Sequence, residues 1–348
     1  MSRAKQDDSE LPHPRTTAAL FGHHDAEQTL LADYRGGRIA HAWLLGGPPG
    51  IGKATLAYRM ARFVLAHPDP AAPAVQSATS LAVSPDAPAA RRVAGQAHPD
   101  LLVLERTVGD NDKLRSVITV EQVRRTVGFF GSTAGEGGWR VCIVDAADEL
   151  KYPEGPNALL KVLEEPPERA LLLLVCHSAS RVLPTLRSRC SVLAMRPLAQ
   201  SDVARALAAS VGSAENDPQI DAAAAAADGS VARALAFLDE DALALRQRAL
   251  EELERLPSVN ANALHALGDA LVGTDPRPLG AFVDTVNAWL SRSLDDHGAV
   301  NGGLARLERL AEAWERINAA ARDAEVYNLD RKPLVFGVFG LLAEATRG

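Results

Sequence analysis

The stretch Gly46–Thr55 reads GGPPGIGKAT, and within it Gly47 to Lys53 fits the pattern of a phosphate-binding loop, G-x-x-x-x-G-K. The apolar run Ala42–Gly46 before it predicts a buried strand, and the amphipathic run Lys53–Ala66 after it predicts a helix. A strand that leads through a glycine-rich turn into a helix is the context in which this motif binds phosphate. The stretch therefore predicts a P-loop nucleotide-binding fold.

The loop offers both backbone and side-chain groups to a nucleotide. Gly47, Gly50 and Gly52 allow backbone N–H groups to turn toward phosphate oxygens, and the N-terminus of the following helix adds partial positive charge. Lys53 is expected to reach the β- and γ-phosphates. These four residues are therefore predicted to bind nucleotide, and the alternative is a glycine-rich turn without a ligand.

The position after the lysine departs from the motif. Phosphate-binding loops place Ser or Thr there, and its hydroxyl binds Mg²⁺, whereas this chain has Ala54. Thr55 lies one residue further on, about 100° around the helix, so its hydroxyl is expected to point elsewhere. Nucleotide binding through the loop backbone, Lys53 and Thr55 is compatible with the sequence, but ordered Mg²⁺ binding is disfavoured.

A second acidic motif follows the strand-like run Arg140–Val144. Asp145 stands at its end, as in the Walker B pattern that orders Mg²⁺. Many ATPases with this pattern carry next to it the glutamate that activates water, but this chain has Ala146. The alternative role for Asp145 is to cap the following turn. With alanine at both 54 and 146, the sequence argues against ATP hydrolysis at a useful rate.

Further apolar runs predict the rest of a sheet. They are Asp100–Glu105, Arg140–Val144, Ala170–Cys176 and Ser191–Met195, and a helix is predicted at Val120–Phe130. Unbroken apolar strands separated by helices indicate a parallel sheet covered on both faces. The stretch 67–100 is rich in Ala, Pro and Ser, so we expect a flexible insertion rather than a folded element.

The chain length of 348 residues allows two or three domains. We predict a flexible tail at 1–15, an α/β domain at 16–197 with its flexible insertion at 67–99, and a small helical lid of three short helices at 198–241. Residues 242–348 are predicted to be helical throughout.

Composition limits the classes of partner. The net charge is −7 and the acidic excess lies after residue 195, which disfavours binding a nucleic-acid backbone by the C-terminal half alone. No apolar run approaches the roughly 20 residues of a membrane span, and the N-terminus lacks a signal-peptide core, so we expect a cytoplasmic protein without a membrane partner. Cys142, Cys176 and Cys190 form no CxxC pair, and we expect buried thiols rather than zinc ligands or disulfides.

Four motifs together carry a family resemblance. They are HAWLLGGPPGIGK, VCIVDAADEL, NALLKVLEEPPE and LPTLRSRC, the last ending in Ser188-Arg189-Cys190. Taken alone, Arg189 would be interpreted as a surface arginine in a local ion pair. The combination resembles the AAA+ clamp-loader family, in particular the delta-prime branch of bacterial DNA polymerase III. The resemblance covers residues 16–240, and the C-terminal region fits the family's helical collar by position and character only.

The resemblance implies an AAA+ P-loop domain with a parallel sheet, a small helical lid and an all-α collar. It also implies an assembly with tau/gamma and delta subunits, within the DNA polymerase III holoenzyme, that loads the beta sliding clamp onto primed DNA. In this family, one subunit contributes the phosphate loop of an ATP site and its neighbour contributes the arginine of the SRC motif. Arg189 is therefore implied to be an arginine finger that acts in trans on the γ-phosphate.

The resemblance also implies a subunit with a decayed ATP site of its own. Active relatives carry an ATP-sensing arginine at the position of Ala232, and Arg233 is one step off. Many delta-prime chains hold a four-cysteine zinc module where this chain has residues 67–100, which contain no cysteine. We therefore expect no zinc, no other metal and no required cofactor, with weak ATP or ADP binding left open. The alternatives are an active clamp-loader ATPase of the tau/gamma type and an unrelated P-loop enzyme.

Overall fold

The computed structural model describes residues 11–108, 115, 117–132, 134–135, 138–214, 217–273, 275–297, 304–327 and 329–347. They fold into two units. The first unit comprises the chain up to Glu215 together with Gly229–Ala232, and the second comprises Asn216–Asp228 and the chain from Arg233 onward.

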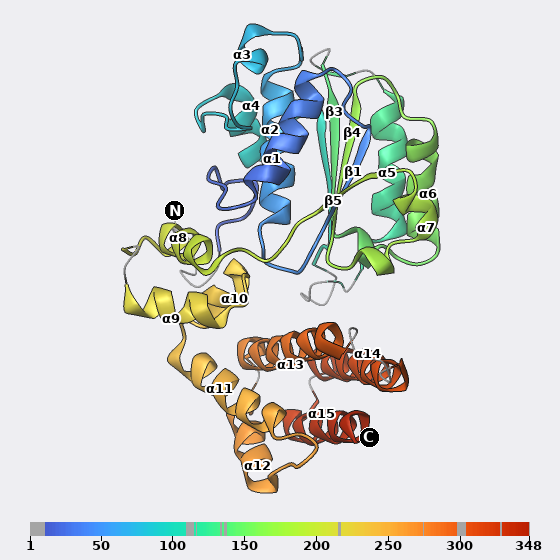
Figure 1. Ribbon diagram of the computed structural model, residues 1–348. Helices are drawn as coiled ribbons and strands as arrows, with labels where there is room; N and C mark the ends of the chain where they lie inside the picture. Colours follow the sequence, from blue (N-terminus) through green and yellow to red (C-terminus); the bar gives the residue numbers. More distant parts are fainter. Residues whose placement is uncertain are drawn as a thin grey trace, which may run out of the picture. The chain divides into compact units, whose positions relative to one another are not determined.

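A five-stranded sheet with the order β2-β3-β4-β1-β5 forms the centre of the first unit (Figure 1). Its strands are β1 Ala42–Gly46, β2 Leu101–Glu105, β3 Arg140–Asp145, β4 Ala170–Cys176 and β5 Ser191–Ala194. All four neighbouring pairs are parallel. Each strand lies within one residue of the bounds predicted from its apolar run. The predicted α/β fold with a parallel sheet is therefore confirmed.

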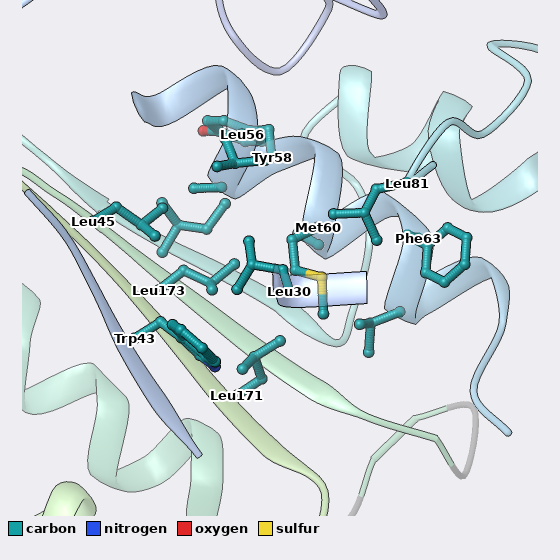
Figure 2. Close-up of a cluster of buried hydrophobic side chains, with 14 of the residues drawn as sticks. Leu30, Trp43, Leu45, Leu56, Tyr58, Met60, Phe63, Leu81, Leu171 and Leu173 are labelled. Atoms are coloured by element: carbon teal, nitrogen blue, oxygen red, sulfur yellow. The ribbon is translucent and has the colours of Figure 1, made fainter. Parts of the chain in front are cut away.

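Helices cover both faces of this sheet. One face packs against α1 His24–Arg35 and α2 Lys53–Ala66, and the other against α5 Val120–Gly131 and α6 Glu154–Glu164 (Figure 1). Successive strand residues point to opposite faces, so Trp43 and Leu45 join the first core, which Figure 2 shows, and Leu44 joins the second. Burial on both faces explains why β1 and β4 carry no polar residue.

The stretch 67–100 contains two helices, α3 Pro73–Gln76 and α4 Pro88–Ala94, so the prediction that it is not a folded element is wrong. Its apolar residues Val75, Leu81 and Val93 are buried in the first core, and Figure 2 shows Leu81 there. They were missed because they are single apolar residues spaced among Ala, Pro and Ser.

The predicted flexible tail at 1–15 is held in place at its described end. Residues 1–10 lie outside the described residues, but Arg62 in α2 donates hydrogen bonds to the Arg15 and Thr17 carbonyls at 2.9 and 2.6 Å. The chain is thus already held against α2 at Arg15, within the stretch assigned to the tail.

The remaining elements of the first unit connect and flank the strands. They are the short 3₁₀ turns η1 Ala147–Glu149 and η2 Ala179–Arg181, and the helices α7 Pro184–Arg187 and α8 Gln200–Val211. Of the three cysteines, Cys142 and Cys176 are buried as expected and Cys190 is half-buried.

The second unit is helical in its described residues, as predicted. It contains α9 Pro218–Ala226, α11 Glu240–Glu254, α12 Ala261–Ala270, α13 Pro276–His297, α14 Leu304–Val326 and α15 Arg331–Thr346. α10, Val231–Ala236, begins in the first unit and ends in the second. The core of the second unit is aliphatic and aromatic and includes Phe282, Ile317 and Phe339. Searched over the part of the chain that the structure describes, no helix combines the length and apolar character needed to cross a membrane.

Candidate functional site

The phosphate loop, residues 47–53, joins the carboxyl end of β1 to the amino end of α2. Gly50 has a φ of +74°, and a side chain there would clash with Ala232. The Gly50 carbonyl accepts a hydrogen bond from the Val231 N–H at 2.9 Å. His23 Nε2 donates to the Ile51 carbonyl at 2.8 Å, and burial lowers the pKa of His23, which favours the neutral ring. The loop is therefore held by packing and hydrogen bonds from outside the motif.

Lys53 is buried under this loop, with 3% of its surface exposed. Its Nζ donates hydrogen bonds to the carbonyls of Gly47, at 2.7 Å, and Pro48. Gly47 and Gly52 have φ values of +155° and +99°, which glycine adopts readily. Burial lowers the pKa of Lys53 to about 8, while the nearby acidic groups, Asp145 among them, act in the opposite direction. The lysine ammonium thus bonds to the carbonyls of its own loop.

Asp145 ends β3 at the same edge of the sheet as the phosphate loop. Burial and the negative charge of Glu105, its register partner on β2, raise the pKa of Asp145, and the Lys53 ammonium lowers it. Glu105 is itself paired with His13, with 3.6 Å between Oε2 and Nε2, and this contact lowers the pKa of Glu105. The turn Ala147–Glu149 has no side-chain cap, so the capping alternative for Asp145 finds no support.

An open pocket of about 1290 Å³ lies over the loop, within the first unit. The predicted site residues that line it are Gly50, Gly52, Lys53, Thr55 and Asp145. Gly47 and Arg189 do not line it. The two alanines at positions 54 and 146 line it as well. The polar side chains that this chain lacks at those positions would therefore have lain at this pocket.

The acidic residues after Ala146 have structural partners. The Asp148 carboxylate accepts hydrogen bonds from the backbone N–H groups of His177 and Ser178, each at 3.1 Å to the nearer oxygen, and so anchors the chain after β4. Glu149 forms an ion pair with Arg106 at 2.9 Å. Asp148 thus bonds to the backbone after β4, and Glu149, which also lines the pocket, is paired with an arginine.

The position expected for an ATP-sensing arginine lies next to the phosphate loop. Ala232 lies beside Gly50, where active relatives are implied to carry the arginine. Arg233, the next residue, forms an ion pair with Asp228 at 3.4 Å, and Arg246 approaches the same carboxylate at 3.7 Å. Arg233 is thus engaged inside the second unit.

Arg189 lies at the opposite edge of the sheet from the phosphate loop. It precedes β5 by two residues, and the first residue of β5, Ser191, pairs with Trp43 near the start of the parallel strand β1. The Arg189 side chain is 37% exposed. Its Nη2 forms an ion pair with Glu164 Oε1 at 2.8 Å, and its Nη1 donates to the Thr185 carbonyl at 2.9 Å. The structure therefore separates Arg189 from the other predicted site residues.

Three histidines lie at this site although the sequence did not predict them there. His23 supports the loop through Ile51, His13 pairs with Glu105, and His177 lines the pocket after β4. Burial lowers the pKa of His177, with the charge of Lys53 adding to the effect. None of the three belongs to a motif with a fixed spacing, and only the fold brings them to the loop.

Comparisons with known protein sequences agree with the motifs. The delta' subunit of DNA polymerase III from Pseudomonas aeruginosa is 40% identical over 165 residues, which cover 47% of this chain and 46% of that protein. The gamma/tau subunit from Mycobacterium bovis is 28% identical over an alignment of 346 positions, which covers 90% of this chain and 57% of that protein. A solved gamma subunit-related protein from Thermotoga maritima is 14% identical, with a TM-score of 0.45, covering 91% of this chain and 99% of that chain.

The match to the first curated relatives spans about half of their length, 46% and 43% for two delta' subunits. A family model described as DNA polymerase III, delta subunit, matches residues 22–199. The resemblance inferred from the motifs is therefore confirmed, and the chain belongs to the DNA polymerase III delta subunit family.

Proposed function

We propose that this chain is a clamp-loader subunit of the delta-prime type, which does not hydrolyse ATP by itself and supplies Arg189 to the ATP site of a neighbouring subunit. One observation carries the proposal. Arg189 is exposed at the amino-terminal edge of the sheet, while the chain's own phosphate loop follows the carboxyl end of β1. An arginine so far from the chain's own phosphate loop can act only on a nucleotide that is bound to another subunit.

The chain's own loop supports the same division of roles. It keeps the glycines and Lys53 but has alanine where a Mg²⁺ ligand, a water-activating glutamate and an ATP-sensing arginine are expected, at Ala54, Ala146 and Ala232. Each of the three lies beside the loop or lines the pocket. The proposed partners are gamma/tau and delta subunits, with the beta sliding clamp and primed DNA reached through the assembled complex.

Replacing Arg189 by Ala tests the proposal. In a loader reconstituted with gamma/tau and delta subunits, R189A is expected to lower the DNA-stimulated ATPase rate by about tenfold or more, because an arginine finger stabilises charge on the γ-phosphate. Arg187→Ala is the matched control, since Arg187 is also exposed and its Nη1 donates to the Ala179 carbonyl at 3.3 Å. An R189A loader that hydrolyses ATP at the wild-type rate would refute the trans role.

A second candidate function, nucleotide binding at the chain's own loop, is favoured by the retained glycines, Lys53 and the open pocket. Any such binding is expected to depend weakly on Mg²⁺, because Ala54 removes a metal ligand. Titration with ADP with and without Mg²⁺ measures this, and a large Mg²⁺ effect would contradict it. ATP turnover by the isolated chain would instead favour an active subunit of the tau/gamma type.

A further inference from the structure

We infer that Glu164 is the positioning residue that orients Arg189 for its action on a neighbouring subunit's nucleotide. This inference rests on the proposed function, and it adds a second residue to the surface that this chain presents in trans. Glu164 is the last residue of α6 and belongs to the stretch NALLKVLEEPPE, which the proposed function does not otherwise use.

The Arg189 guanidinium is held through both of its terminal nitrogens. Nη2 pairs with Glu164 Oε1 at 2.8 Å, and Nη1 donates to the Thr185 carbonyl at 2.9 Å. Two contacts on a planar group fix both its position and the direction of its plane. A guanidinium has further N–H donors beyond these two, so the restrained group can still donate to a phosphate oxygen.

Both groups that hold Arg189 stand on elements anchored in the core. Leu163, immediately before Glu164, is 2% exposed, and its carbonyl contacts His41 Nε2 at 3.2 Å, which ties the end of α6 to the start of β1. Thr185 belongs to α7, where Leu186 is fully buried. A catalytic group held by rigid supports loses less freedom when it meets its target.

The exposure of the pair argues that its role is orientation rather than stability. The side chains of Arg189 and Glu164 are 37% and 50% exposed, and ion pairs at such sites contribute little to folding. Removing the carboxylate should therefore leave the fold intact. With a neutral amide in its place the hold on the Nη2 end of the guanidinium should weaken, and arginine is a long side chain with many rotamers. The productive orientation would then be populated less often.

Glu164→Gln tests the inference in the reconstituted loader with primed DNA and ATP. We expect kcat to fall by about threefold, with KM for ATP, loader assembly and the melting temperature unchanged, because displacing a catalytic group slows the chemical step. Glu165→Gln is the matched control. It removes the same charge from the next, exposed residue, which forms no ion pair within the described residues, and it should leave kcat unchanged.

The double variant R189A/E164Q separates positioning from an independent role. If Glu164 acts through Arg189, the double variant should be no slower than R189A alone. A further loss in the R189A background, or equal rates for E164Q and E165Q while R189A is slow, would overturn the inference and leave the proposed function standing. An R189A loader with the wild-type rate would overturn both.

Discussion

Burial of Lys53 makes the free energy of unfolding of the protein dependent on pH. Its pKa is lowered from 10.5 to about 8, so between these pH values the unfolded chain binds more protons at this position than the folded chain does. The Lys53 contribution to the free energy of unfolding therefore rises as pH increases from about 8 toward 10.5. Below pH 8 the folded protein bears the full cost of a buried ammonium.

The variant Lys53→Met removes this titration while keeping a side chain of similar length. The free energy of unfolding of the wild type, measured relative to K53M by urea denaturation, is expected to rise by about 1 to 2 kcal/mol between pH 7.5 and 9.5. Groups that titrate in both proteins, such as the buried tyrosines, cancel in the difference. Parallel pH profiles for the two proteins would show that Lys53 titrates normally.

Residues of the site differ in how far the sequence could predict them. Lys53 and Asp145 belong to motifs in which the spacing and the preceding strand fix the side chain's place, and both line the pocket over the loop. His23 and His177 follow no such pattern. His23 reaches Ile51 from 28 residues away, and His177 owes its place to the Asp148 carboxylate on a neighbouring strand's loop. Long-range contacts of this kind leave no local signal.

At the scale of elements, buried strands were the most predictable parts and short helices on the surface of the core were the least. β4 consists entirely of apolar residues with both faces covered, so its run of seven marks its own bounds. In contrast, α3 and α4 together bury only a few apolar residues, and the link between them is fixed by a distant group. The Leu81 N–H donates at 2.9 Å to the Glu27 carboxylate in α1. Composition alone does not reveal such support.

The pairing of α13 with α14 rests in part on two asparagines. Asn287 and Asn318 exchange hydrogen bonds between their side-chain amides at 3.0 and 2.9 Å, and both side chains are half-buried. Replacing one by alanine leaves its partner without these bonds, so each of N287A and N318A is expected to destabilise the protein by about 1 to 2 kcal/mol. Urea denaturation measures the loss.

The double variant N287A/N318A provides the control for this pair. Because both single variants break the same reciprocal contact, the double variant should cost about 1 kcal/mol less than the sum of the two single losses. Strict additivity would mean that the two amides stabilise the helices independently of each other.

At the scale of the whole molecule, the division into two units does not follow the order of the sequence. Within the predicted helical lid at 198–241 the chain passes from the first unit to the second more than once. Gly229–Ala232 belongs to the first unit, and the residues on both sides of it belong to the second. Two backbone hydrogen bonds fix this short segment, from Val231 N–H to the Gly50 carbonyl and from Leu198 N–H to the Gly229 carbonyl. Helix periodicity identifies the lid helices, but it does not reveal that a short segment between them belongs to the first unit.

The placement of the two functional groups on opposite edges of one sheet leads to a final prediction. Suppose that Arg189 acts on a neighbour's nucleotide and that the chain's own loop has no catalytic role. Replacing Arg189 and replacing Lys53 should then have very different effects on the ATPase rate of the assembled loader. K53M is expected to leave the DNA-stimulated ATPase rate within about twofold of wild type, whereas R189A lowers it by about tenfold or more. Both rates are measured at saturating ATP, with assembly checked by gel filtration. A K53M loader as slow as the R189A loader would place the chain's own loop in the catalytic cycle, and the three alanines beside that loop would then have to be compatible with turnover.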